Sequence, residues 1–259
     1  MLLLLLAFLL SPGAVTEEII GGHEAKCRPH PYMALVKFLT KDSWKRCGGI
    51  LVWRDFVLQT ATHCWGSSIT VTLGAHNISK PESTQQVINV NRAFRHPDYN
   101  SKNLSNDIML LKLMRKAKLT SAVKPLSLPS PRAQMRPGQV CSVASWGMVV
   151  MGTLATTLQE VHLTVQKKQM CEASIFQGFY SRDTQICVGD QNKMKSSFKK
   201  PPMPRGPGDL VCGDNSAQGI FTYGQRNGTP PGVFIKISSL LPWVRRTMRH
   251  PLHWRYGSQ

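Results

Sequence analysis

The sequence predicts an all-β protein with two closed β units and one C-terminal helix. Short runs of apolar and β-branched residues recur with turn residues between them, and residues 68–73 and 87–90 alternate as half-buried strands do. The runs fall into two sets of about five or six, a pattern typical of barrels. The predicted strands are 33–39, 49–58, 68–73, 86–92 and 107–113 in the first set, and 139–146, 158–166, 185–188, 219–223 and 232–237 in the second.

The segments between and after the two sets complete this organisation. Residues 124–137 bear several prolines and are predicted to be the linker. Residues 239–248 are predicted to form a helix, because apolar residues recur at helical spacing, Ser239 can cap the N-terminus and Pro242 falls in the first turn. Residues 249–259 then form a C-terminal tail. With 259 residues, 42% of them hydrophobic, the chain can bury such a core.

The N-terminus predicts entry into the secretory pathway. Residues 1–16 contain an apolar run of signal-peptide length, although the usual positive charges before it are absent. Glu17-Glu18 and Ile19-Ile20 follow, a pattern typical of a removable pro-segment ahead of a new N-terminus. The alternative is an acidic loop that enters a strand. No other segment is long enough to cross a membrane. Secretion would allow disulfides, and glycosylation at Asn77, Asn103 and Asn227.

The chain is strongly basic, with a formal charge of +18. Residues 1–18 contain Glu17 and Glu18 but no lysine or arginine, so their removal raises the charge to +20. Such a surface attracts polyanions such as sulfated glycans, nucleic acid or acidic membranes, and a merely solvated surface is the alternative. We expect no sequence-specific nucleic-acid partner. The basic clusters are Arg115-Lys116-Ala117-Lys118, Lys167-Lys168, Lys199-Lys200 and Arg245-Arg246.

One stretch, Thr60-Ala61-Thr62-His63-Cys64, predicts acid–base chemistry. It places a histidine, which can accept a proton at neutral pH, beside a cysteine at the end of an apolar strand. Asp107 begins another apolar strand, where a hydrogen-bonded carboxylate could orient that base. A disulfide between Cys47 and Cys64 would fix His63 and stabilise the fold by about 3 kcal/mol. No Cys-x-x-Cys or His-x-x-x-His spacing occurs, so no metal or cofactor is expected.

Several motifs occur together in this chain. They are Ile19-Ile20-Gly21-Gly22, Ala61-Thr62-His63-Cys64, Asn106-Asp107-Ile108-Met109-Leu110-Leu111, Ser145-Trp146-Gly147 and Pro230-Pro231-Gly232-Val233. With these motifs the chain resembles the trypsin-like (chymotrypsin-fold) serine proteases, and within them the granzymes. Residues 19–26, 47–52, 72–78 and 153–161 are most similar to the granzyme B and granzyme H group. The resemblance implies one protease domain over residues 19–248.

This resemblance implies two six-stranded antiparallel β-barrels with the active site between them, protein substrates, and a place in cytolytic granules or outside the cell. A dipeptidyl peptidase would remove residues 17–18, the activation dipeptide, and leave Ile19 as the N-terminus. His63 takes the place of the general base, and Asp107 that of the acid that orients it. The implied disulfides are Cys47–Cys64, Cys141–Cys212 and Cys171–Cys187, and Cys27 is left as a free or dimer-forming thiol.

The chain departs from the family pattern most strongly at the nucleophile. Active relatives carry Gly-Asp-Ser-Gly-Gly-Pro between Phe-Lys and Leu-Val-Cys, whereas here residues 200–209 separate Phe198-Lys199 from Leu210-Val211-Cys212. This segment is four residues longer and contains four prolines but no serine. Prolines lack the amide hydrogens that an oxyanion hole requires. Milder departures are Thr62 in place of alanine and Ser145 in place of glycine.

Nearby serines do not replace the missing nucleophile. Ser216 is predicted to lie in a hairpin turn, and Ser197 is expected, like Ser196, beside the pocket. Asp209, directly before a strand, is a weak candidate for the acid that pairs with the ammonium group of Ile19. By family position the substrate pocket contains Ser196, Thr222, Tyr223, Gly224 and Gly232, which carry no charge and imply a neutral pocket for bulky apolar side chains.

Three hypotheses follow for the function. The first is a granzyme-like serine endopeptidase whose nucleophile segment is misread, for instance at an exon boundary. The second is a catalytically inactive, cationic granule protein that binds sulfated glycans or microbial surfaces. The third is a relic that is untranslated or does not fold. The chain as written is expected to be inactive, because the serine and the oxyanion loop are both replaced.

Overall fold

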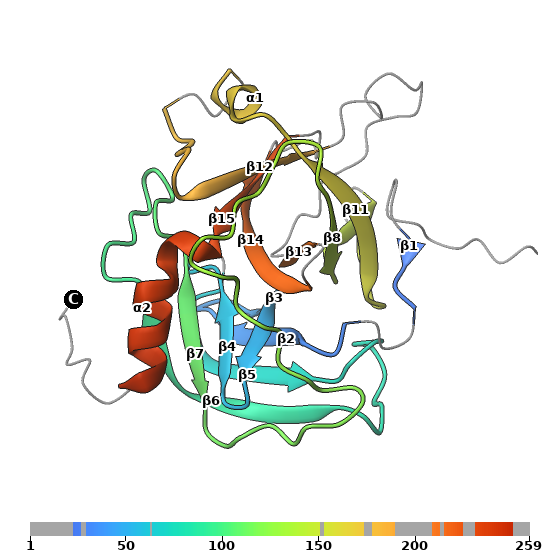
Figure 1. The fold of residues 1–259 in the computed structure, drawn as a ribbon. Coiled ribbons are helices and arrows are strands. Elements are labelled where there is room, and N and C mark those ends of the chain that lie inside the picture. Colours follow the sequence, from blue (N-terminus) through green and yellow to red (C-terminus); the bar gives the residue numbers. More distant parts are fainter. Residues whose placement is uncertain are drawn as a thin grey trace, which may run out of the picture.

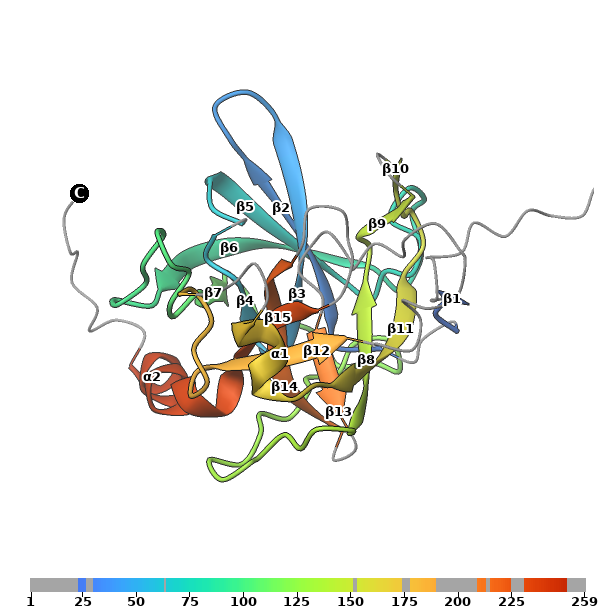
Figure 2. The same cartoon turned by 90° about the horizontal axis from the view of Figure 1, so that it is seen from above.

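The computed structural model describes residues 23–26, 30–62, 64–150, 153–173, 178–189, 209–212, 215–224 and 231–250. Two β-barrels are stacked one above the other, and helix α2 (Ile237–Arg249) packs at their side (Figure 1). Seen from above, α2 lies on the opposite side of the molecule from a small ribbon made of β9 (Met148–Val150) and β10 (Thr153–Leu154) (Figure 2).

The first barrel contains six antiparallel strands in the order β2-β3-β4-β7-β6-β5, and pairing of β5 with β2 closes it. Each predicted strand of the first set lies in this barrel. Because alternate residues of a strand point to opposite faces, each strand sends one row of apolar side chains into the barrel. The strands are β2 (Met33–Leu39), β3 (Trp44–Trp53), β4 (Phe56–Gln59), β5 (Ser67–Leu73), β6 (Gln86–Arg95) and β7 (Met109–Leu113).

The prediction of a single strand over residues 49–58 is wrong. β3 begins before residue 49, and a two-residue turn at Arg54 and Asp55 separates it from β4. The turn is held by Lys112, whose Nζ lies 2.6 Å from Asp55 Oδ2. Val52 before this turn and Phe56 after it are almost fully buried, and apolar residues stand on both sides of the turn, so the hydrophobic pattern does not reveal the break.

The second barrel is also a closed ring of six antiparallel strands, β8-β13-β14-β15-β12-β11, in which β11 pairs back with β8. The two rings confirm the predicted all-β fold with two six-stranded barrels. β1 (His23–Glu24) joins β11 outside the ring. The ring strands are β8 (Val140–Ser145), β11 (Gln159–Val165), β12 (Gln185–Gly189), β13 (Asp209–Cys212), β14 (Ser216–Gly224) and β15 (Gly232–Lys236).

One buried cluster joins the two barrels and α2. The connection from β7 to β8, which includes the predicted linker, crosses this junction, and its Leu126 N–H donates a hydrogen bond to Leu51 O at 2.8 Å. Farther along the connection, Ser127 O accepts from Ala217 N–H at 3.0 Å. The linker therefore hydrogen-bonds to both barrels. Members of the cluster include Leu35, Ile50, Leu126, Ile220, Ile235, Leu241 and Trp243.

The C-terminal helix begins at Ile237 rather than at the predicted Ser239 cap. Ile237 is fully buried and follows β15 without a loop, so packing rather than a capping side chain sets the start. Ser239 Oγ instead donates to Lys236 O at 2.6 Å, and Pro242 lies inside the helix. Within the part of the chain that the structure describes, no helix is long and apolar enough to span a bilayer.

Three disulfides brace these elements, and they are the pairs that the resemblance implied. Cys47–Cys64 joins β3 to the segment after β4, and Cys141–Cys212 joins β8 to β13. Cys171–Cys187 joins the short helix α1 (Lys168–Glu172) to β12. Cys27 lies outside the described residues.

Candidate active site

Asp107 is a fully buried carboxylate with hydrogen bonds to both of its oxygens. The backbone N–H of Thr62 donates to Oδ1 at 2.7 Å, and the hydroxyl of Thr222 donates to Oδ2 at 2.6 Å. An ionised carboxylate is tolerated in a protein interior when donors replace the water that it has lost. These two bonds therefore hold Asp107 in one orientation.

The three residues of this network come from different parts of the fold. Thr62 follows β4 and Asp107 precedes β7, both in the first barrel, whereas Thr222 belongs to β14 of the second. The carboxylate thus connects the barrels at the place where the resemblance expects the active site. Thr222 was predicted to lie in the wall of the pocket. Its hydrogen bond to Asp107 was not predicted, because the sequence carries no local signal for it.

His63, the expected general base, lies outside the described residues, but both of its neighbours are anchored. Thr62 is held by Asp107, and its hydroxyl lies 3.1 Å from the hydroxyl of Tyr99. Cys64 is held by its disulfide to Cys47. The hydroxyl that Thr62 adds to the family pattern is therefore accommodated by a hydrogen bond.

A stack of cationic and aromatic side chains lies against the same segment. The guanidinium carbon of Arg95 is 4.1 Å from the ring centroid of Trp65 and 5.2 Å from that of Tyr99. Arg95 thus contacts residues that hold the chain on both sides of His63, since Tyr99 bonds Thr62 and Trp65 follows Cys64. No motif in the sequence predicts this role for Arg95, Trp65 or Tyr99.

The described part of the predicted pocket wall is uncharged. Gly224 pairs with Gly232, so the two lie on neighbouring strands. The hydroxyl of Tyr223 donates to Gln185 Oε1 at 3.0 Å, and burial raises the pKa of Tyr223 well above its ordinary value. Burial also raises the pKa of the neighbouring Tyr180, to about 12. Both phenols are therefore neutral at physiological pH. Ser196 lies outside the described residues.

Ser216 is not beside the Asp107 network. It is the first residue of β14, directly after the turn in which it was expected, and it is 5% exposed. Gln218 Nε2 donates to its hydroxyl at 2.7 Å. Thr222 lies six residues farther along the same strand, which at the usual rise corresponds to about 20 Å. This separation supports the exclusion of Ser216 as a nucleophile.

The other predicted site residues are placed only in part. Asp209 begins β13, whose backbone pairs with β14 on one side and β8 on the other, while Ile19, its suggested partner, is outside the described residues. Asn77 and Asn103 are half-buried and accept hydrogen bonds from the backbone N–H of Ser79 and Ser105. Asn227, Ser197 and residues 199–208 are also outside. Among the described residues no group of three or more His, Cys, Asp or Glu could hold a metal.

Comparisons with known proteins agree with this arrangement. The family model described as Trypsin matches residues 19–244. The chain is 65% identical to granzyme H of Homo sapiens over 247 residues, which cover 95% of this chain and 98% of that protein. It is 54% identical to granzyme B of Homo sapiens, with 96% and 98% covered. A solved structure titled "Structure of GrC" superimposes with a TM-score of 0.81 at 49% identity, covering 89% of this chain and 99% of that one.

Proposed function

The chain belongs to the granzyme group of the trypsin-like serine proteases, and we propose that it is a member that binds rather than cleaves. The observation that carries this proposal is the replacement of the nucleophile segment by residues 200–209, which contain no serine. In this proposal the protein is a cationic constituent of secretory granules. A dipeptidyl peptidase removes its residues Glu17-Glu18. Its partners are sulfated glycans.

Chemistry supports the loss of catalysis. Asp107 and His63 can form the acid and base of a triad, but a base without a nucleophile cannot start acyl transfer. Loss of the serine alone costs on the order of 10⁶ in rate, about 8 kcal/mol. Enzymes that lose only a triad residue keep some activity through the oxyanion hole, and residues 200–209 replace that hole as well.

Surface charge supports the binding role. The formal charge reaches +20 once residues 1–18 are removed. The clusters around Lys116 and Arg245, far apart in sequence, contribute side chains to the same hollow on the first barrel. Sulfated glycans carry closely spaced negative charges, and neutralising several of them releases counterions. A disulfide-linked dimer through Cys27 would double the number of such contacts.

A second candidate function is an active granzyme-like endopeptidase, made from a transcript with an intact nucleophile segment. The hydrogen-bonded Asp107 favours it, because the carboxylate is held as a working triad requires. Its pocket would accept bulky aromatic or aliphatic side chains, because Thr222, Gly224 and Gly232 offer no charge. Sequencing the transcript across residues 197–212 distinguishes the two candidates.

Labelling with a fluorophosphonate tests the proposal on the protein itself. The chain processed to Ile19 should neither be labelled nor cleave peptide thioesters with aromatic residues. Its control is the same chain with Gly-Asp-Ser-Gly-Gly-Pro in place of residues 200–209, which should do both. Stoichiometric labelling of the processed chain at any serine would overturn the proposal. If the control chain cleaved best after aspartate, that result would contradict the neutral pocket.

A further inference from the structure

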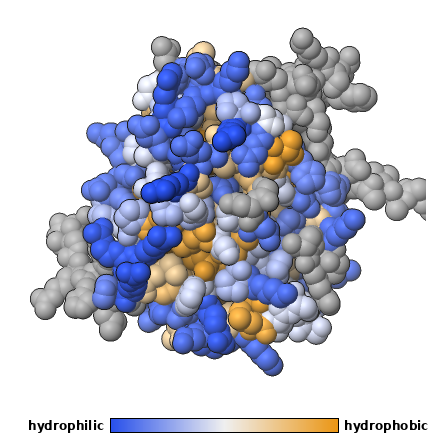
Figure 3. All heavy atoms as spheres, in the orientation of Figure 1, coloured by the Kyte–Doolittle hydropathy of each residue, from blue (hydrophilic) through white to orange (hydrophobic). Residues whose placement is uncertain are grey.

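A hollow on the first barrel combines exposed apolar side chains with cations. Its volume is about 910 Å³, and it lies between the β3–β4 turn, the connection after β7 and the last turns of α2. On the face shown in Figure 3, hydrophobic surface lies beside strongly hydrophilic surface over α2. The apolar lining includes Trp53, Phe56, Leu119, Leu126 and Met248, and the cationic lining Arg54, Lys112, Lys116, Arg245 and Arg249.

Two of the apolar residues project into solvent at the edge of this hollow. Trp53 is 58% exposed and Leu119 is 46% exposed, whereas Phe56 and Leu126 behind them are almost fully buried. Apolar surface that lines one hollow and is flanked by polar residues is a feature of protein- and membrane-binding sites. Tryptophan is also the side chain that favours the boundary between water and lipid.

The cations of the hollow are in excess over acids. Its lining contains one carboxylate, Asp55, and that group is bound to Lys112 at 2.6 Å. The four remaining cations, Arg54, Lys116, Arg245 and Arg249, form no ion pair with the described residues. A group of cations without neighbouring acids favours an anionic partner, because the charges of the two are complementary.

We propose that this hollow binds anionic lipid at a membrane surface. The head group lies on Arg54, Lys116, Arg245 and Arg249, while Trp53 and Leu119 enter the boundary region of the bilayer. A sulfated glycan would contact the cations but leave the exposed apolar pair in water, so the pair favours lipid. Lipid binding at this hollow does not depend on the proposed glycan binding.

The test measures binding of the processed chain to phosphatidylcholine vesicles with and without phosphatidylserine. We expect binding that requires phosphatidylserine and persists in part at high salt, because apolar contact is not screened. The double variant Trp53→Ser with Leu119→Ser should bind at least about tenfold more weakly, since it removes the apolar contact. Lys116→Gln should lower affinity about fivefold.

Matched controls distinguish binding at this hollow from non-specific binding of vesicles. Trp44 lies at the other end of β3 with the same 58% exposure and outside the hollow, so Trp44→Ser should leave vesicle binding unchanged. Thermal unfolding verifies that each variant is folded. Retention of the double variant on heparin should equal that of the parent chain.

Several results would overturn the proposal. They are equal vesicle binding by the parent chain and the double variant, an equal loss in Trp44→Ser, or complete loss of binding at high salt. A folded double variant that also lost heparin retention would assign the hollow to glycans instead. If the parent chain binds these vesicles but not heparin, the lipid site stands and the proposed glycan function fails.

Discussion

Asp107 shows how a buried carboxyl group depends on its neighbours. Its two oxygens receive one hydrogen bond from each barrel, through Thr62 and Thr222, so the residue contributes to the association of the barrels. This structural contribution does not depend on catalysis. The consequence of removing a donor can therefore be measured as stability, without any catalytic assay.

Substitution of Thr222 by valine should destabilise the fold by about 1–3 kcal/mol, because Asp107 Oδ2 loses its donor in a buried site. Thr247 provides the matched control. Both threonines are fully buried, but the Thr247 hydroxyl has no hydrogen-bond partner among the described residues. Thr247→Val should therefore be neutral or stabilising. Equal losses in the two variants, measured by denaturant unfolding, would contradict the importance of the Asp107 bond.

Glu160 of β11 links stability to pH. Burial alone would raise its pKa, but the hydrogen bonds from Ser142 and His30 and the nearby charges of His30 and His162 outweigh burial and hold the pKa of Glu160 below its ordinary value of 4.5. Because the folded carboxylate resists protonation, Glu160 stabilises the fold above about pH 4.5, and this contribution is lost as the pH falls through the lowered pKa.

Glu160→Gln should therefore be less stable than the parent chain at neutral pH, and the difference in unfolding free energy should shrink as the pH falls below about 4.5. Glu24→Gln is the control, because Glu24 is exposed and its contact with His76 is a surface pair. A difference between parent and Glu160→Gln that did not change with pH would show that the carboxylate acts only through packing.

At the scale of elements, the hydrophobic pattern predicts where strands lie better than where they end. The alternation in residues 68–73 predicts the bounds of β5 to within one residue, although burial increases along the strand instead of alternating. The turn at Arg54 and Asp55 was missed, because residues 50–53 before it and residues 56–58 after it are all apolar. The start of α2 was misjudged for a related reason: Ile237 is fixed by packing and not by a cap.

The same limit applies to the candidate site. Asp107 could be predicted because a single acid at the mouth of an apolar strand is conspicuous in the sequence. Its bond to Thr222 joins residues in different barrels, and no spacing along the chain reveals such a contact. The contacts of Tyr99 with Thr62 and Arg95 are likewise products of folding.

The disulfide between β8 and β13 should matter most among the three, because it closes the longest loop. Its sequence separation is 71 residues, against 17 for Cys47–Cys64 and 16 for Cys171–Cys187. The loop-entropy estimate gives about 4 kcal/mol for the long loop and about 3 kcal/mol for the short ones.

Replacing Cys141 and Cys212 by alanine should therefore lower the unfolding free energy by about 1 kcal/mol more than replacing Cys171 and Cys187. This disulfide also fixes β13, whose first residue, Asp209, is the last residue of the proline-rich segment 200–209. Denaturant unfolding of the two double variants measures the difference. A larger loss from the short loop would show that local packing, not loop entropy, determines their contributions.

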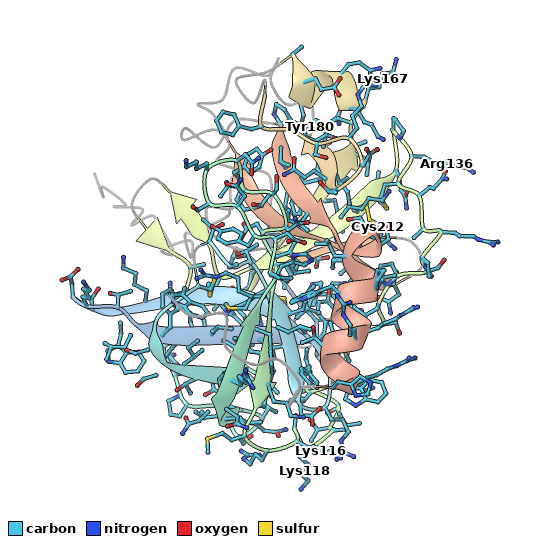
Figure 4. The ribbon with its side chains drawn as sticks, turned by 90° about the vertical axis from the view of Figure 1, so that its left-hand side faces the viewer. Lys116, Lys118, Arg136, Lys167, Tyr180 and Cys212 are labelled. Carbon is cyan, nitrogen blue, oxygen red and sulfur yellow. A yellow bond between two sulfur atoms is a disulfide. The ribbon has the colours of Figure 1, made fainter. Side chains whose placement is uncertain are left out.

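At the scale of the whole molecule, positive charge is spread over both barrels but not evenly. Lys116 and Lys118 lie at the first-barrel end of the molecule, and Lys167 lies at the opposite end (Figure 4). Lys116 and Arg245 line one hollow with three other cations, whereas Lys167 and Lys168 stand at the start of α1. A long polyanion gains most where several cations can be neutralised together.

Retention on heparin should therefore depend chiefly on the first-barrel end. Lys116→Gln combined with Arg245→Gln should elute at lower salt than the parent chain, and the logarithm of affinity should fall less steeply with the logarithm of salt, by about one to two units of slope. Lys167→Gln with Lys168→Gln removes the same charge and should have the smaller effect. Equal shifts in the two double variants would mean that net charge alone governs binding. Elution of the parent chain near physiological salt would count against a glycan partner altogether, because a surface of this charge binds any polyanion weakly and a functional contact must exceed that background.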